Sequence, residues 1–171
     1  MYNITEIFTS INGEGRNAGQ LAVFVRFKGC QLNCSYCDTK WANCDDTPYT
    51  KMSADEIYQK IKLQNIKRVT ITGGEPLIQN GIIDFLTLLS NDESLAVEIE
   101  TNGAVSIRDV LNIRKNRPSL TMDYKLPSSN MEKHMIYENL CLIEKDDTIK
   151  FVCGSKMDLE RAYEVINKYK L

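Results

Sequence analysis

The sequence predicts an α/β fold, a partial and open parallel β/α barrel of about five to six βα units. Apolar, β-branched runs alternate with segments of helical periodicity along most of the chain. Two of the predicted strands end in glycine-containing turns, Thr72-Gly73-Gly74 and Thr101-Asn102-Gly103. Because right-handed crossovers bring the carboxyl ends of parallel strands to one rim, we expect these turns to lie together and to face a ligand.

The predicted strands differ in how completely they are buried. Residues 1–8 alternate weakly and form a short first strand, whereas residues 21–27 are mostly apolar, as is typical of a buried parallel strand. Arg26 lies inside that run, so its charge needs Glu14, another carboxylate, an acidic ligand or access to water. Further strands are expected at residues 67–72, 94–100, 120–123 and 148–153.

Helices are expected between and after these strands. The first has Ser53 as N-cap and Glu56 three positions later, the pattern of a capping box, and it places Ile57 and Ile61 on one face. The others span residues 82–89, 105–113 and 158–170, and the last of these is amphipathic. Residues 12–15, 47–50 and 125–129 are rich in turn formers and are expected to be loops.

The composition limits the class of protein. With 171 residues, 43% hydrophobic and 26% charged, the chain is expected to form one globular domain over residues 1–171. Lysine and arginine number 21 against 23 aspartate and glutamate, and a net charge of −2 argues against nucleic-acid binding. No signal peptide or membrane-spanning run is visible, and half of the six cysteines are bunched, so we expect a cytoplasmic protein with no membrane partner.

Cys30, Cys34 and Cys37 form a C-x3-C-x2-C loop directly after the apolar strand. Thiolates favour iron–sulfur clusters, copper(I) or zinc, and a closed site normally takes four ligands. Three cysteines on one loop therefore indicate a cluster with one iron left open. The alternatives are a non-catalytic zinc-binding module that uses these three with Cys44 or another distant residue, and plain buried thiols.

The segments around this loop carry a family resemblance. They are Glu6-Ile7-Phe8-Thr9-Ser10-Ile11-Asn12-Gly13-Glu14-Gly15, Phe24-Val25-Arg26, Cys37-Asp38-Thr39, Thr72-Gly73-Gly74-Glu75-Pro76 and Glu100-Thr101-Asn102-Gly103. In this order and at these separations, the sequence from Thr5 to about Ser129 resembles the 7-carboxy-7-deazaguanine synthase family of the radical S-adenosylmethionine (SAM) superfamily.

The resemblance implies a barrel of the radical SAM type and a lyase. It implies a 4Fe-4S cluster on the three cysteines, SAM on the open iron, and Mg2+ as a further cofactor. The implied reaction converts 6-carboxy-5,6,7,8-tetrahydropterin, the pterin substrate, to 7-carboxy-7-deazaguanine with loss of ammonia, through a 5'-deoxyadenosyl radical, in 7-deazapurine (queuosine-type) biosynthesis. The implied partners are an electron donor such as flavodoxin or ferredoxin and, as one option, a second copy in a homodimer.

The resemblance also assigns residues by motif. Cys30, Cys34 and Cys37 would hold the cluster, and the Thr39 hydroxyl would ligate magnesium. The residues implied at the SAM site are Tyr36, Cys37, Asp38, Gly74, Glu75, Asp123, Tyr124 and Lys125. Those implied at the substrate are Ile11, Asn12, Gly13, Glu14, Arg26 and Thr72. No catalytic residue beyond the cofactor-derived radical is expected.

The sequence departs from the family pattern in two places. Asn12 stands where the family usually carries glutamine. The chain is short at the C-terminus, where members normally continue past the helix at residues 158–170 into another strand that helps to bind SAM.

A glycyl-radical enzyme activase would also carry the three cysteines, but it does not explain residues 10–15 or Pro127-Ser128-Ser129. His134, the only histidine, is expected at the surface. Cys44 and Cys141 match no motif, and Cys153 is expected to be a buried small hydrophobic residue at the end of a strand.

Overall fold

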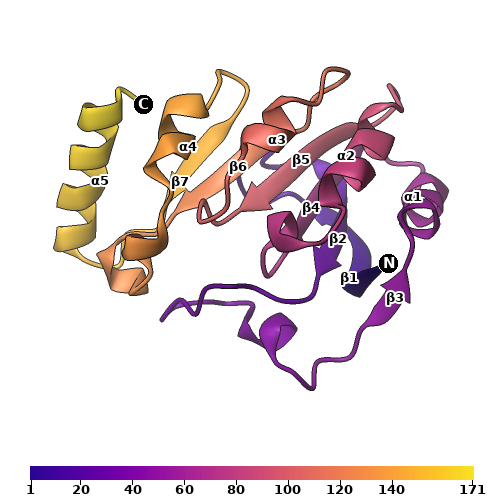
Figure 1. Cartoon of the computed structure of the whole chain (residues 1–171), viewed down its shortest axis with the longest axis horizontal. Coiled ribbons are helices and arrows are strands. Elements are labelled where there is room, and N and C mark those ends of the chain that lie inside the picture. The colour runs from indigo at the N-terminus through magenta and orange to yellow at the C-terminus, as the bar shows by residue number, and fades with distance from the viewer.

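A computed structural model describes residues 1–171 and is organised around one seven-stranded sheet with the order β3-β1-β2-β4-β5-β6-β7 (Figure 1). The strands in chain order are β1 Tyr2–Ile11, β2 Leu21–Phe27, β3 Thr50–Met52, β4 Arg68–Gly73, β5 Ala96–Thr101, β6 Ser119–Tyr124 and β7 Thr148–Phe151. Parallel pairing links β2, β4, β5, β6 and β7. The sheet is open and mostly parallel, which confirms the α/β fold class predicted as a partial, open barrel.

The amino-terminal edge of the sheet is antiparallel, so the expectation of an entirely parallel sheet was wrong there. β1 pairs antiparallel with β2 on one side and with β3 on the other. Residues 12–20, which join β1 to β2, are too few for a parallel crossover, which needs roughly a dozen residues or more. A hairpin is therefore the connection that this spacing permits.

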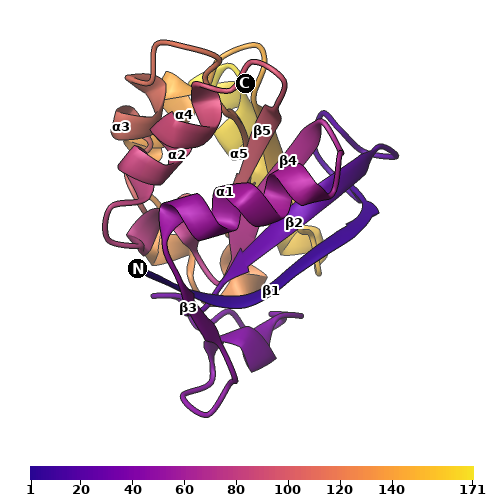
Figure 2. The same ribbon diagram turned by 90° about the vertical axis from the view of Figure 1, so that its right-hand side faces the viewer.

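Helices α1 to α4 lie on one face of the sheet, and α5 lies beyond β7 (Figures 1 and 2). Their bounds are α1 Ala54–Leu63, α2 Ile82–Ser90, α3 Arg108–Leu111, α4 Tyr137–Leu142 and α5 Lys156–Tyr169. The predicted capping box is present, since Ser53 Oγ accepts from Glu56 N at 3.2 Å and Glu56 Oε2 accepts from Ser53 N at 2.7 Å. None of the helices has the length and apolar character needed to cross a membrane.

α3 is much shorter than the helix expected at residues 105–113. The buried side chain of Asn139 donates to the carbonyls of Gly103 (3.1 Å) and Val105 (2.8 Å) and accepts from the N–H of Ile107 (3.2 Å). These bonds hold the segment before Arg108 outside a helix, because they use backbone groups that a helix would pair internally. Asn139 lies on α4, a helix that was not predicted.

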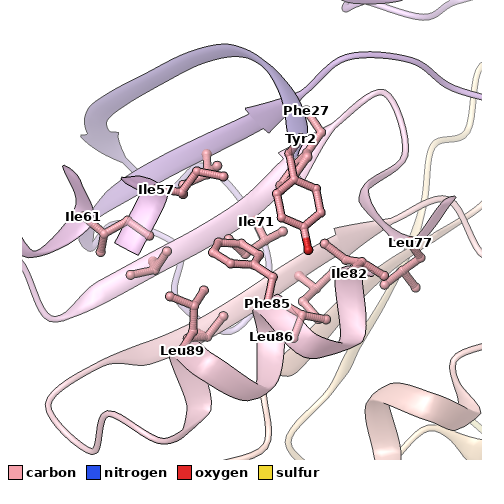
Figure 3. Close-up of a cluster of buried hydrophobic side chains, with 14 of the residues drawn as sticks. Tyr2, Phe27, Ile57, Ile61, Ile71, Leu77, Ile82, Phe85, Leu86 and Leu89 are labelled. Carbon is pink, nitrogen blue, oxygen red and sulfur yellow. The ribbon is translucent and has the colours of Figure 1, made fainter. Parts of the chain in front are cut away.

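The main hydrophobic core lies between the sheet and the helices (Figure 3). Ile71 and Ile99 on adjacent strands are fully buried against Phe85 and Leu89 on α2 and against Ile57 on α1. A second, smaller cluster joins the carboxyl half of the sheet to α4 and α5 and includes Leu32 and Cys34 of the cysteine loop. The cysteine loop is thus packed onto the body of the protein.

Candidate functional site

A pocket of about 630 Å³ lies at the carboxyl ends of the parallel strands. Thr72, Glu100, Asp123 and Lys150 line it from four strands. Each stands next to a core-facing residue, as Glu100 does to Ile99, because successive side chains on a strand point to opposite faces. The pocket therefore occupies the face of the sheet that the helices do not cover.

Most of the residues assigned from the sequence line this one pocket. They are Ile11, Gly13, Glu14, Arg26, Cys30, Cys34, Tyr36, Cys37, Asp38, Thr39, Thr72, Gly74, Asp123 and Lys125. They come from β1, β2, the cysteine loop, β4 and β6, so segments that are distant in the sequence meet at one rim. The outcome fits the expectation that parallel strands bring their terminal turns together.

Three assigned residues do not reach the pocket with their side chains. Glu75 is fully buried, and its carboxylate accepts from Leu77 N, Thr101 Oγ1 and Asn102 N at 2.7–3.0 Å. Tyr124 packs in the second core cluster and donates to Glu132 Oε1 at 3.0 Å. Both side chains are buried and hydrogen-bond within the protein, and a motif match alone does not reveal this.

Asn12 is the third of these residues. With Thr70 and Glu98 it forms a buried group of hydrogen-bonded polar side chains below the pocket. Its amide donates to Glu98 Oε2 at 2.8 Å and to Thr70 Oγ1 at 3.1 Å, and it is 1% exposed. Gly15 has φ +69° and approaches Glu98 and Thr121 so closely that no Cβ would fit there. The Asn12–Gly15 turn is therefore held in place by the face of the sheet that the helices do not cover, which we call the inner face.

The glycines after β4 hold the cysteine loop. Gly74 N donates to Phe27 O at 3.1 Å and Glu75 N donates to Gly29 O at 2.8 Å. A Cβ at Gly74 would collide with the Gly29 carbonyl. Gly73 and Gly74 line the pocket, but the N–H groups of Gly74 and Glu75 bond to the chain that enters the cysteine loop and are not free to bind a ligand.

Two other strand ends clamp the rest of the loop. Ser35 N donates to Ser129 O at 3.0 Å and Ser35 Oγ donates to Ser128 O at 2.5 Å, after β6. Gln31 Nε2 donates to Asn102 Oδ1 at 3.3 Å, after β5. The ends of β4, β5 and β6 thus each fix one part of the loop, which preorganises its three thiols.

The donor set of the loop fits an iron–sulfur cluster. All three thiols line the pocket, and burial raises the pKa of Cys30 and Cys34 above the usual range of a thiol. No group of three or more His, Cys, Asp or Glu side chains surrounds a single metal position. In a cluster the thiolates bind different irons, so three cysteines on one loop are a donor set that suits it.

The remaining cysteines lie outside the pocket. Cys44, the fourth ligand in the zinc interpretation, is exposed, and its sulfur lies 3.3 Å from Lys40 O. Cys141 is exposed as well. Cys153 is also exposed, so the expectation of a buried Cys153 was wrong, because β7 ends at Phe151 and Cys153 falls in the loop beyond it. His134 is exposed, as expected.

Three buried polar atoms in the pocket wall have no hydrogen-bond partner in the protein: Tyr36 Oη, Asn43 Oδ1 and Asp123 Oδ1. Such atoms are costly to bury, so they mark positions for groups of a ligand. Burial, and then Asp123, raise the pKa of Tyr36 to about 12, so its hydroxyl stays protonated. One hydroxyl and two acceptors suit a ligand that carries both hydrogen-bond donors and an acceptor.

Charged side chains pair across the pocket. Arg26 Nε lies 2.7 Å from Glu6 Oε1, so Glu6 is its protein partner and not Glu14. Glu14 instead pairs with Lys150 Nζ at 2.6 Å. Lys150 also lies 3.1 Å from Asp123 Oδ2. These ion pairs connect Glu14, in the loop between β1 and β2, to Asp123 on β6 through Lys150 on β7.

The pocket residues that were not assigned from the sequence include Asn43, Glu100, Asn102 and Lys150. Lys150 pairs in register with Asp123, so the period-two pattern of β7 could have placed it on the inner face. Burial raises the pKa of Glu100 above its usual range, which makes this carboxyl a site that can hold a proton nearer neutral pH. Asn43 ends a 3-10 helix and carries no comparable sequence pattern.

Comparisons with known proteins agree with this geometry. The family model of the radical SAM superfamily matches residues 24–170. The chain is 55% identical over 170 residues to the 7-carboxy-7-deazaguanine synthase of Clostridium acetobutylicum, covering 99% of this chain and 76% of that one. It is 36% identical to the enzyme of the same name from Thermoplasma acidophilum, covering 97% and 77%. The crystal structure of QueE from Escherichia coli superposes with a TM-score of 0.75 at 26% identity, covering 97% of this chain and 77% of that one.

Proposed function

Because this chain belongs to the radical SAM superfamily and, within it, to the 7-carboxy-7-deazaguanine synthase family, we propose that it converts 6-carboxy-5,6,7,8-tetrahydropterin to 7-carboxy-7-deazaguanine. The observation that carries the proposal is that three loop cysteines, an arginine and an array of carboxylates share one pocket. Cluster chemistry and recognition of a charged heterocycle can therefore occur side by side. The enzyme acts on a small molecule and requires a reductant.

The cluster and SAM are the cofactors of this superfamily, and together they supply a 5'-deoxyadenosyl radical that removes a hydrogen atom from the substrate. Cys30, Cys34 and Cys37 would bind the cluster on the loop that the three strand ends clamp. The hydrogen bonds that Gly29, Gln31 and Ser35 make to the strand ends limit the loop's freedom, so the three thiols would be held in place for the cluster.

SAM would lie along the wall that carries the unpartnered atoms. Asp123 Oδ1 and Asn43 Oδ1 would accept from its donors, and the Tyr36 hydroxyl would donate to an acceptor. Asp38 and Lys125 line the same wall. Gly74 would act through its lack of a side chain, which lets the loop close over β4, and Glu75 would act as a positioning residue beneath.

The substrate would lie over the inner face of the sheet. Arg26 offers a guanidinium to the substrate carboxylate, and Glu6 holds that guanidinium in place from the protein side. Glu14 and Thr72 would accept from the amino and ring N–H donors of the pterin, with Ile11 and Gly13 at the pocket mouth. Asn12 would support this loop from below, and its shorter side chain already fits that position.

A magnesium site is proposed beside Thr39. The Thr39 hydroxyl lies in the pocket wall and donates to Asp38 Oδ1 at 2.8 Å. Hydroxyl and carboxylate oxygens are the hard donors that Mg2+ prefers, and a substrate carboxylate would add another. We further propose flavodoxin or ferredoxin as the electron donor, and the homodimer stays a prediction.

The test is an anaerobic assay of the reconstituted protein with dithionite, magnesium, SAM and 6-carboxy-5,6,7,8-tetrahydropterin. Mass spectrometry would measure 5'-deoxyadenosine and the deazapurine. Substrate-dependent formation of 7-carboxy-7-deazaguanine is expected. SAM cleavage without that product would overturn the proposed substrate while leaving the superfamily chemistry intact, and an intact cluster with no SAM cleavage would overturn the proposed activity of this chain.

A further inference from the structure

We propose that Asn102 sets the reduction potential of the cluster by donating a hydrogen bond to the sulfur of Cys30. The inference rests on the proposed function, because it requires a cluster on the cysteine loop. Asn102 was not assigned a role by any motif, although it lies in the turn after β5 and lines the pocket.

The three loop cysteines differ in their surroundings. Cys30 Sγ accepts from Asn102 Nδ2 at 3.5 Å and from Leu32 N at 3.4 Å. These are the hydrogen bonds that reach a loop sulfur from N–H donors, and both go to Cys30. One ligand of the cluster would therefore be hydrogen-bonded while the other two are not.

The orientation of the Asn102 amide is determined by its other contacts. Its Oδ1 accepts from Ala104 N at 2.9 Å and from Gln31 Nε2 at 3.3 Å, and its Nδ2, with two N–H groups, also donates to Gln31 Oε1 at 3.3 Å. Turning the amide over would direct its NH2 group at the Ala104 N–H, which is another donor, so the Nδ2 atom must face Cys30. The side chain is 7% exposed, so water does not compete strongly for this donor.

The backbone of Asn102 is held as well. Its N–H donates to Glu75 Oε2 at 2.7 Å, and Glu75 also accepts from Thr101 Oγ1 at 2.9 Å. Glu75 is in turn tied through its own N–H to the entry of the cysteine loop. The donor is therefore anchored on both sides of the bond that it makes to Cys30.

An N–H dipole that points at a thiolate stabilises negative charge on the sulfur. Reduction adds an electron to a cluster, so the reduced state gains more from this bond than the oxidised state. Removing the donor should therefore make the cluster harder to reduce. The Asn102–Cys30 hydrogen bond should also persist when the cluster is bound, because a thiolate is a better acceptor than a thiol.

The experiment is an EPR-monitored redox titration of the reconstituted wild-type protein, Asn102→Ala and Ser35→Ala. Both variants are neutral truncations at the cysteine loop, but only the first removes a donor to the Cys30 sulfur, because Ser35 Oγ donates to Ser128 O. We expect a more negative midpoint potential for Asn102→Ala and an unchanged one for Ser35→Ala. Equal potentials in all three proteins at full iron and sulfide content would overturn the proposal, as would equal shifts in the two variants.

A second measurement does not depend on the variant retaining its cluster. Pulsed EPR of the reduced wild-type protein, labelled with 15N in its asparagine side chains, should show a nitrogen coupling to the cluster. Absence of that coupling would overturn the proposal. A shifted potential in a protein that makes no deazapurine would leave this inference standing and reject the proposed substrate, whereas normal product with an unshifted potential would reject only the inference.

Discussion

The two faces of the sheet have different roles: the outer face, covered by helices, forms the hydrophobic core, and the inner face lines the pocket. On the outer face, Ile71 and Ile99 are fully buried against α1 and α2 and contribute to stability. On the inner face of the same strands, Thr72 and Glu100 line a pocket of about 630 Å³. Because strand side chains alternate, neighbouring residues belong to different functions. A substitution should therefore affect either folding or ligand binding according to the face that it occupies.

The largest expected effect is on the inner side, at the cysteine loop. Cys34→Ala should lose the cluster and all activity, because it removes one of three thiolates. Cys44→Ala should keep its iron, because Cys44 is exposed and lies outside the pocket. Iron and sulfide analysis after anaerobic reconstitution measures both, and equal iron loss in the two variants would restore the zinc-module interpretation.

The corresponding change on the outer face is Phe85→Ala on α2. Phe85 is fully buried and contacts Tyr2 and Phe27, so truncation should lower the free energy of unfolding by about 3–5 kcal/mol. Urea unfolding measures this loss. The folded fraction should still bind iron through the three loop cysteines, and a fully folded Phe85→Ala protein without iron would contradict the separation of the faces.

The third prediction concerns how the free energy of unfolding depends on pH through Glu75, which is buried beneath the pocket. Burial raises the pKa of Glu75 to about 7, above an unfolded-state value of about 4.3. Its contribution to stability is therefore complete below about pH 4.3 and is lost as the pH rises towards 7. Glu75→Gln should cost about 1–3 kcal/mol in the apo protein, and the cost should shrink over this pH range.

Urea unfolding of wild-type protein and Glu75→Gln between pH 4.5 and pH 8 measures that trend. A cost that grows with pH would mean that Glu75 is ionised in the folded protein. Glu56→Gln is a matched control, because Glu56 is exposed in the capping box and its pKa is lowered by Ser53, so its pH trend should have the opposite sign.

The smallest effect on stability is expected at Lys150. Its ion pairs with Glu14 and Asp123 are about one-third exposed on the lysine side, so Lys150→Met should change the free energy of unfolding by less than about 1 kcal/mol. Substrate KM should rise roughly tenfold, because Glu14 loses a partner that orients it. Steady-state kinetics measures this, and an unchanged KM would remove Lys150 from the site.

Much of the fold could be predicted from the sequence because its causes are local. The apolar run that became β2 had the predicted bounds, and the capping box at Ser53 formed between residues three positions apart. The three cysteines were placed in one pocket by their spacing alone. Local periodicity could not show the short α3, because Asn139, the residue that delays its start, lies more than thirty positions away.

The sequence by itself determined six of the seven strands, the Ser53 cap and the identity of the cysteine loop, whereas β3 was not predicted, because residues 47–50 were expected to be a loop. Only the tertiary structure decided which polar residues face the pocket: it buried Glu75 and Asn12, and it brought Asn43, Asn102 and Lys150 to the rim. The physical reason is that the position and role of a polar side chain depend on its hydrogen-bond partners, which can lie far away in the sequence. Asn102 meets Cys30 across 72 positions and Asn12 meets Glu98 across 86, and such pairs exist only once the sheet has formed.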